Sequence, residues 1–205
     1  KGIMIVGVGG QGTLLASRIL GNVLMSEGYD VKMSEVHGMA QRGGSVVSQV
    51  RVSEKVYSPI IGTGETDVLV AFEKVEALRF AHFLSPDGVA MINDQEIRPV
   101  TVSSGQSKWP EDLDERLRAQ FAKVELIPAL EIARGLGSVR VVNVVMIGAL
   151  SNYLPVTEEV WRESIRALVK PKFIDLNLKA FDAGRASCCT VSPGGQAAGS
   201  PLSAE

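Results

Sequence analysis

Glycines, one arginine and amide side chains are the residues of this chain whose types and spacing could support chemistry. Gly7, Gly9 and Gly12 follow the pattern G-x-G-x-x-G at the end of an apolar run, residues 3–8. A glycine turn between a strand and a helix leaves backbone N–H groups uncovered, and the helix dipole favours an anion there. The motif therefore predicts an anion site. A turn that only packs the first helix on a sheet would have the same sequence.

A second glycine-rich stretch, residues 36–45, reads VHGMAQRGGS. It places the guanidinium of Arg42 next to Gly43 and Gly44, whose backbone amides no side chain covers. A permanent positive charge beside exposed amides suits a phosphate or a carboxylate. Arg42 could equally form an internal ion pair with Glu35.

Glu35 keeps a dinucleotide site open as an alternative. It lies 23 positions after Gly12, close to the roughly 20 positions at which a dinucleotide-binding fold places the acid for a ribose hydroxyl. The same carboxylate could instead brace Arg42 or a backbone turn. His37 alone is weaker evidence of chemistry, and a structural role is favoured for it.

Composition excludes several classes of function. The 205 residues include 21 Lys and Arg and 23 Asp and Glu, for a net charge of -2, so we expect no nucleic-acid partner. No apolar run reaches the roughly 20 residues that span a bilayer, and residues 1–6 are too short for a secretory signal. We therefore expect a soluble, cytoplasmic protein without a membrane partner. Two adjacent cysteines and two histidines make no metal-ligand cluster.

Catalytic motifs are also missing from the sequence. It has no G-x-x-x-x-G-K-[ST], no G-x-S-x-G and no C-x-x-C. It also lacks the Gly-Asp-Gly followed by Asn that holds thiamine diphosphate through a divalent metal. We therefore assign no catalytic residue and no metal ligand to the chain, and we expect difficult redox chemistry to need a partner.

Alternating strands and helices must position the two glycine loops. In the first half, Thr13 is a candidate helix cap, residues 35–44 a loop, residues 46–52 a partly exposed strand and residues 85–88 a turn. The pattern predicts an α/β fold, a Rossmann-like, doubly wound and mostly parallel sheet with helices on both faces. We expect strands over residues 3–8, 30–34, 46–52, 67–72 and 89–93, and helices over 13–27 and 73–83.

The second half is richer in helix candidates. We expect a strand over 123–127 and helices over 111–121, 127–136, 142–150 and 157–169, the last capped by Thr157. Of the 23 residues from 183 to 205, 15 are Gly, Pro, Ser or Ala, too few apolar groups to offset the entropy of ordering. The predicted organisation is one domain over 1–184 and a low-complexity tail over 185–205. Within the tail, Cys188 and Cys189 are interpreted as an incidental exposed pair.

Several sequence strings resemble the gamma-type domain of the 2-oxoacid:ferredoxin oxidoreductases, most of all the small beta subunits that act on indolepyruvate. The likeness covers residues 1 to about 184. Its most specific part is the string HGMAQRGG, because an arginine and two glycines are fixed within it. The strings are GVGGQG at 7–12, SEVHGMAQRGGSVVS at 34–48, SPII at 58–61, AFE at 71–73, and Asn177, Ala180, Phe181 and Gly184.

The resemblance implies a subunit of an enzyme that oxidatively decarboxylates a 2-oxoacid, indolepyruvate or another arylpyruvate, with coenzyme A. The products would be an acyl-CoA, CO2 and reduced ferredoxin. It implies that thiamine diphosphate, Mg2+ and the [4Fe–4S] clusters lie on a large alpha subunit, so that the chain acts in a hetero-oligomer and is inactive alone. If the chain belongs to this family, the spacing of 23 positions between Gly12 and Glu35, which resembles that of a dinucleotide site, is coincidental.

The resemblance also implies a Rossmann-like domain that packs over the partner's active-site region and is associated with coenzyme A docking. Carried over by position, none of the motif residues is catalytic. A stand-alone NAD(P)-binding dehydrogenase and a noncatalytic scaffold domain are the alternatives. The residues expected to form the binding cleft are Gly9, Gly10, Gln11, Gly12, Gln41, Arg42, Gly43 and Gly44.

Overall fold

A six-stranded sheet forms the middle layer of the protein in this computed structural model, which describes residues 1–38, 43–98, 102, 104–105 and 108–188. The strand order is β2-β3-β1-β4-β5-β6. Strands β1, β4, β5 and β6 are parallel, and β3 is antiparallel to both β1 and β2. The expected α/β class with a mostly parallel sheet is confirmed. The strands are β1 (Gly2–Val8), β2 (Asp30–His37), β3 (Ser45–Ser53), β4 (Thr66–Ala71), β5 (Leu84–Asn93) and β6 (Val124–Ile127).

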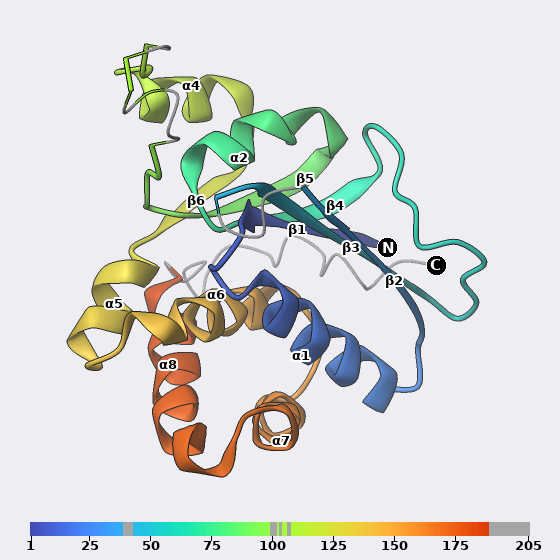
Figure 1. The fold of residues 1–205 in the computed structure, drawn as a ribbon. Coiled ribbons are helices and arrows are strands. Elements are labelled where there is room, and N and C mark those ends of the chain that lie inside the picture. The colour runs from blue at the N-terminus through green and yellow to red at the C-terminus, as the bar shows by residue number, and fades with distance from the viewer. Residues whose placement is uncertain (39–42, 99–101, 103, 106–107, 189–205) are drawn as a thin grey trace, which may run out of the picture.

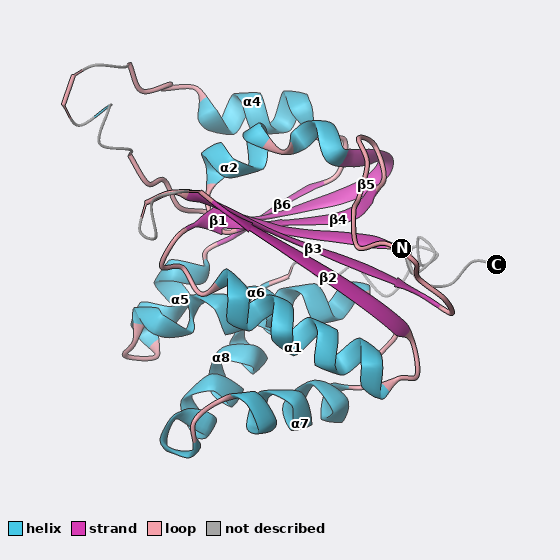
Figure 2. Ribbon diagram, turned by 45° about the vertical axis from the view of Figure 1, so that its right-hand side comes forward, coloured by secondary structure: helices cyan, strands magenta, loops and turns pink. Residues whose placement is uncertain are grey.

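Helices cover both faces of the sheet, as expected for this class (Figures 1 and 2). One face carries α2 (Lys74–Arg79) and α4 (Leu113–Gln120). The other carries α1 (Thr13–Ser26), α5 (Ala129–Gly135) and α6 (Val142–Leu150), with α7 (Glu158–Leu168) and α8 (Ile174–Ser187) outside them. The sequence analysis did not predict α8. Short 3-10 turns lie at Ala81–Phe83, Val139–Val141, Ser151–Tyr153 and Pro171–Phe173.

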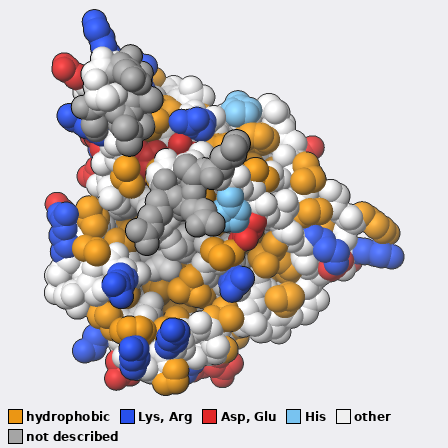
Figure 3. All heavy atoms as spheres, in the orientation of Figure 1, with side chains coloured by type: hydrophobic (Ala, Val, Ile, Leu, Met, Phe, Trp, Pro, Cys, Tyr) orange, Lys and Arg blue, Asp and Glu red, His pale blue; other side chains and the backbone are white. Residues whose placement is uncertain are grey.

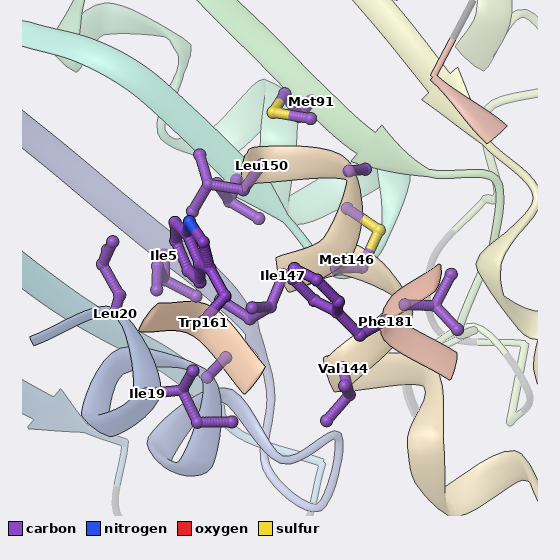
Figure 4. Packing of buried hydrophobic residues seen from close by; sticks show 14 of the residues in the cluster. Ile5, Ile19, Leu20, Met91, Val144, Met146, Ile147, Leu150, Trp161 and Phe181 are labelled. Carbon is purple, nitrogen blue, oxygen red and sulfur yellow. The ribbon is translucent and has the colours of Figure 1, made fainter. Parts of the chain in front are cut away.

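Strand β1 is buried on both faces because its side chains alternate between two apolar clusters. Ile3 and Ile5 face the larger cluster, which α1, α6, α7 and α8 complete, whereas Met4 and Val6 face the smaller one under α2 and α4. Figure 4 shows the larger cluster at Trp161, whose indole lies between residues of α1, α6 and the sheet. This central strand carries the first glycine loop.

Strand β3 lies inside the sheet, so the expectation of a partly exposed strand away from the centre is wrong in position. It pairs with β1 on one side and with β2 on the other. The residues Val46, Ser48, Val50 and Val52 are buried on the face toward α1, and only the opposite face, with Gln49 and Arg51, is partly exposed. The half-polar pattern of β3 indicated that one face of the strand is partly exposed. It did not indicate where the strand lies in the sheet.

Two expected loops are strands in the structure. Strand β2 continues to His37, so Glu35 belongs to a strand; β2 is an edge strand, which tolerates exposed polar side chains. The turn expected over residues 85–88 lies within β5, next to a register shift between Thr66 and Val68 of β4. In both cases a polar or glycine-rich composition led to the prediction of a loop where the structure has a partly exposed strand.

The two expected threonine caps make no capping hydrogen bond. Helix α1 begins at Thr13, and its N-cap position is taken by Gly12 in the left-handed conformation. Thr157 does occupy the N-cap position of α7, but its side chain accepts no backbone N–H.

The boundary between domain and tail, placed after residue 184, stays a prediction. Helix α8 continues to Ser187, and residues 189–205, which include Cys189, lie outside the described part of the chain. The expectation of an exposed cysteine is wrong for Cys188. Its side chain is buried, and its thiol donates a hydrogen bond to the carboxylate of Glu125 on β6.

Candidate functional site

Two glycine loops meet at the edge of the sheet where the parallel strands end. Because β3 is antiparallel to β1, its first residue, Ser45, pairs with the last residue of β1, Val8. The loop between β2 and β3 therefore ends beside the turn that leaves β1. The fold thus brings together two sequence motifs separated by about thirty residues.

The first loop requires glycine for its backbone conformation. Gly10 and Gly12 have φ values of 105° and 82°, which residues with a Cβ rarely adopt. A Cβ on Gly10 would meet no atom within 4 Å among the described residues, so the backbone there is open to an approaching group. A Cβ on Gly12 would lie 2.8 Å from Nδ2 of Asn143.

The turn opens directly into the N-terminus of α1. No side chain caps this helix, and its first turn holds no acidic residue, so the first-turn N–H groups and the positive end of the dipole are not neutralised locally. On the inner side, Nδ2 of Asn143 donates to the carbonyl oxygen of Gly12 over 3.3 Å. This bond fixes the start of α1 to the buried helix α6.

Backbone hydrogen bonds join the base of the second loop to the first. The N–H of Gly9 donates to Gly44 over 2.8 Å, and the N–H of Gly43 donates back to Gly9 over 3.4 Å. Gly43 has a φ of 81°, and a Cβ there would meet nothing within 4 Å of it among the described residues. Six of the eight expected cleft residues are therefore adjacent. The other two, Gln41 and Arg42, lie outside the described residues.

Helix α2 holds the second loop from the other face of the sheet. The hydroxyl of Ser45 donates to the buried carboxylate of Glu76, whose other oxygen lies 2.9 Å from Nε of Arg79. Since Ser45 directly follows Gly44, this contact holds the loop base against α2. Sequence reasoning did not single out Glu76.

Glu73 caps α2 where β4 ends. Its carboxylate accepts the backbone N–H groups of Val75, over 3.0 Å, and of Glu76, and only 1% of its surface is exposed. Burial raises the pKa of Glu73 above its usual range, although the two N–H bonds act in the opposite direction. The Glu73 of the string AFE is thus explained by helix capping.

The next residue, Lys74, ties the following segment to the sheet. Its ammonium lies 2.7 Å from Asp94, 2.6 Å from Asp114 and 3.6 Å from Glu96. Burial of the ammonium lowers the pKa of Lys74, but the hydrogen bonds that the ammonium donates to Asp114 and Asp94 outweigh it and leave the pKa raised. The side chain is 7% exposed and stays charged at neutral pH. It links the start of α2 to the end of β5 and to α4.

The contacts of Glu35 within the protein account for its carboxylate, so no dinucleotide ribose is needed to explain it. Ser17 of α1 donates its hydroxyl to Glu35 over 3.1 Å. Because β3 is inserted between β1 and β2, Glu35 also lies two strand spacings from β1, about 10 Å, instead of one. The spacing that resembles a dinucleotide site is therefore not matched by dinucleotide-site geometry. His37 is exposed at the end of β2.

Surface charge and metal ligands add no second site among the described residues. On the face seen in Figure 3, basic and acidic side chains are interspersed. The described part of the chain contains no group of three His, Cys, Asp or Glu that could hold a metal ion. Within it, no helix has the length and apolar character needed to cross a bilayer.

Sequence reasoning missed the polar residues that support the loops from beneath: Asn93, Gln95, Asn143 and Glu76. A signal for two of them was present. The string Asn-Asp-Gln at 93–95 begins at the last residue of a buried strand, and side chains in that position gather at the carboxyl edge of a parallel sheet.

Comparison with known proteins gives a consistent result over nearly the whole chain. The family model described as pyruvate ferredoxin/flavodoxin oxidoreductase matches residues 2–187. The indolepyruvate oxidoreductase subunit IorB of Thermococcus kodakarensis is 42% identical over 187 residues, which cover 89% of this chain and 93% of the relative. The corresponding subunit IorB of Archaeoglobus fulgidus is 44% identical, with 89% and 92% covered.

A solved structure has the same fold at low sequence identity. It is the 2-oxoglutarate:ferredoxin oxidoreductase from Magnetococcus marinus with 2-oxoglutarate, coenzyme A and succinyl-CoA bound. The TM-score is 0.70 and the identity 22%, over 91% of this chain and 30% of that one. The chain therefore corresponds to one part of that longer polypeptide.

Proposed function

The chain belongs to the pyruvate ferredoxin/flavodoxin oxidoreductase family, and from this we propose that it is the small subunit of an enzyme that oxidises indolepyruvate or another arylpyruvate with ferredoxin as acceptor. The role as small subunit of an oxoacid:ferredoxin oxidoreductase follows from relatives that match nearly end to end and are named as subunits. The aryl substrate is inferred from the same names. A dehydrogenase or a scaffold domain finds no such support.

The proposed reaction converts a 2-oxoacid and coenzyme A into an acyl-CoA and CO2. The bond between the keto carbon and the carboxylate carbon breaks, and the carboxylate leaves as CO2. A bond forms from the keto carbon to the coenzyme A sulfur. Two electrons pass to ferredoxin, and the thiol proton is released. We place thiamine diphosphate, Mg2+ and the [4Fe–4S] clusters on the large alpha subunit. Two cysteines cannot supply the four thiolates of a [4Fe–4S] cluster, and the sequence lacks the Gly-Asp-Gly followed by Asn that holds thiamine diphosphate through a divalent metal.

For this chain we propose a binding role: the paired glycine loops receive an anionic part of coenzyme A. The observation that carries this proposal is the juxtaposition of open backbone at Gly10 and Gly43 beside the uncapped N-terminus of α1. N–H groups and a helix dipole together bind phosphate groups. Coenzyme A carries phosphates at a distance from its reactive thiol, so such a site would anchor the cosubstrate without touching the reacting atoms.

Arg42 provides the test of this site. In the assembled enzyme, Arg42→Ala should raise the KM for coenzyme A about tenfold or more, because a charge-assisted hydrogen bond contributes about 1.5–3 kcal/mol. The KM for the 2-oxoacid should not change. Arg118→Ala, which removes an exposed arginine of α4, is the matched control. If Arg42→Ala reduces only the amount of complex formed, Arg42 belongs to the subunit interface and the assignment is wrong.

A further inference from the structure

The side chain of Gln11 is directed into the protein, although it lies in the middle of the first glycine loop. Its Oε1 accepts the N–H of Val8 over 2.7 Å, and its Nε2 donates to the carbonyl oxygen of Phe72 over 2.9 Å. Nε2 also lies 3.5 Å from Oε1 of Gln95. Both ends of this amide are therefore engaged by the chain itself.

Asn93, the last residue of β5, meets the same two groups. Its Nδ2 donates to the carbonyl of Phe72 over 3.1 Å and to Oε1 of Gln95 over 2.9 Å. We call Gln11, Phe72, Asn93 and Gln95 the amide bracket. It joins the end of β4 to the end of β5 and to the turn that follows β1.

Hydrogen-bond chemistry fixes the orientation of both amides in this bracket. The carbonyl of Phe72 can only accept, so each amide must present its NH2 group to it. A reversed Asn93 would set its oxygen against two other oxygens. Asn93 is fully buried, and its Oδ1 has no protein partner among the described residues. The order of donors and acceptors thus admits one arrangement of the bracket.

The turn also lacks room for any other arrangement. A Cβ on Gly7 would lie 2.8 Å from Oε1 of Gln11 and 2.9 Å from the side chain of Phe72. The absence of a side chain at Gly7 lets Gln11 fold back under the turn. The turn is further closed by a bond from the backbone N–H of Gln11 to Val8 over 3.2 Å.

We propose that Gln11 is a positioning residue for the coenzyme A site and makes no side-chain contact with the cosubstrate. Its amide holds the turn in the shape that leaves the backbone at Gly10 open. The bracket extends this control to the segment after β5, because Gln95 lies between Asp94 and Glu96, which pair with Lys74. This inference rests on the proposed function of the glycine loops.

The test separates an effect transmitted through the bracket from a direct contact. Gln11→Met keeps the length of the side chain without charge or hydrogen bonds. Asn93→Leu removes the other side-chain donor to Phe72 from a fully buried position that no ligand can touch. Both variants, and the double variant, are assembled with the large subunit. The KM for coenzyme A, the KM for the 2-oxoacid and kcat are then measured.

We expect Gln11→Met to raise the KM for coenzyme A about tenfold, with kcat and the KM for the 2-oxoacid within about twofold of wild type. Asn93→Leu should raise the same KM by several-fold, and the double variant should show less than the product of the two effects, since both act on one bracket. If Asn93→Leu does not assemble, Gln95→Met, at a half-buried position, takes its place.

An unchanged KM for coenzyme A in assembled Gln11→Met overturns the inference. So does a raised KM in Gln11→Met that simply multiplies with an ineffective Asn93→Leu, because that pattern belongs to direct contact. A loss of complex with unchanged kinetics in the remaining enzyme assigns the bracket a purely structural role and also overturns it. Failure of the proposed function is distinct: Arg42→Ala in the assembled enzyme would then also leave the KM for coenzyme A unchanged.

Discussion

Gly10 and Gly12 allow the conformational requirement of the first loop to be separated from its packing. Both have positive φ, so alanine at either position should destabilise the protein by about 1–2 kcal/mol. Gly12→Ala should cost more than Gly10→Ala, because only its Cβ meets a side chain, that of Asn143. Chemical denaturation of the two variants measures the difference. Equal losses of stability would show that the side chain of Asn143 moves away from the new Cβ at no cost.

Glu73 predicts a specific dependence of stability on pH. Its pKa in the folded protein is raised above the 4.5 of a free side chain, mainly by burial. The folded state therefore holds the proton to higher pH than the unfolded state, and the stability that Glu73 contributes is complete below 4.5 and lost as the pH rises through the raised value.

The variant Glu73→Gln isolates this contribution, since it keeps an oxygen for capping and does not titrate. The free energy of unfolding of wild type minus that of the variant should fall as the pH rises from roughly 4 to 7. Denaturation of both proteins across that range tests it. A difference that is constant, or that grows with pH, would contradict a burial-raised pKa.

For single residues, the sequence predicts which positions need the backbone freedom of glycine, but it does not predict which side chains support them. The glycine spacing of residues 7–12 is local, so the turn could be identified directly. The partners of Gln11 are 61 and 84 residues away along the chain. Nothing in a local pattern indicates that a loop amide folds inward to reach them. Gln11 was expected in the binding cleft, which stays a prediction; in the structure its backbone belongs to the first glycine loop and its side chain supports that loop.

Among the elements, α6 and α8 cross at two glycines. A Cβ on Gly148 would collide with the carbonyl oxygen of Phe181, and one on Gly184 with that of Val145. Backbone atoms cannot move aside as a flexible side chain does. Gly148→Ala and Gly184→Ala should each destabilise the protein by about 1–3 kcal/mol or more.

Gly135→Ala is the matched control for this pair. It lies in helix α5, and a Cβ there meets nothing within 4 Å among the described residues. Alanine should be neutral or stabilise by up to about 1 kcal/mol, because it restricts the unfolded chain. Thermal or chemical denaturation compares the three variants. Three similar values would mean that the helices do not cross this closely.

Lys74 should determine the local stability of the segment that follows β5. Lys74→Met removes the common partner of Asp94, Glu96 and Asp114, which are partly exposed and can be solvated. We therefore expect a loss of about 1–2 kcal/mol, less than for a fully buried pair. Hydrogen exchange should become faster in residues 94–98 and in α4.

Lys179→Met provides the comparison, because Lys179 is exposed and has no ion-pair partner among the described residues. It should leave the exchange of both segments unchanged. If Lys74→Met also leaves it unchanged, the segment is held by other contacts, such as the bond from Trp109 to Glu96.

Elements were predictable where apolar residues recur at helical spacing, as in α1, or form a nearly unbroken run, as in β4 and α6. Helix α8 was missed because the side of it that is buried consists of Asn177, Ala180, Phe181 and Gly184. These residues have helical spacing, but only one is large and apolar. The place of β3 could not be derived either. Strand order depends on pairing between distant segments, which composition does not encode.

For the whole molecule, we propose a division of labour. This chain contributes a sheet edge with two glycine loops that are braced by an amide bracket on one side and by Glu76 on the other. We propose that the groups that carry electrons lie on the large subunit. The α/β class could be predicted from the alternation of strands and helices. The family could be predicted from the motif strings, two of which lie at the loops that the fold brings together.

The most direct test of this division is the activity of the purified chain, alone and mixed with its large subunit. The assay is ferredoxin reduction dependent on indolepyruvate and coenzyme A. We predict no turnover by the chain alone and turnover that saturates with coenzyme A after mixing. Sustained turnover by the chain alone would contradict the account.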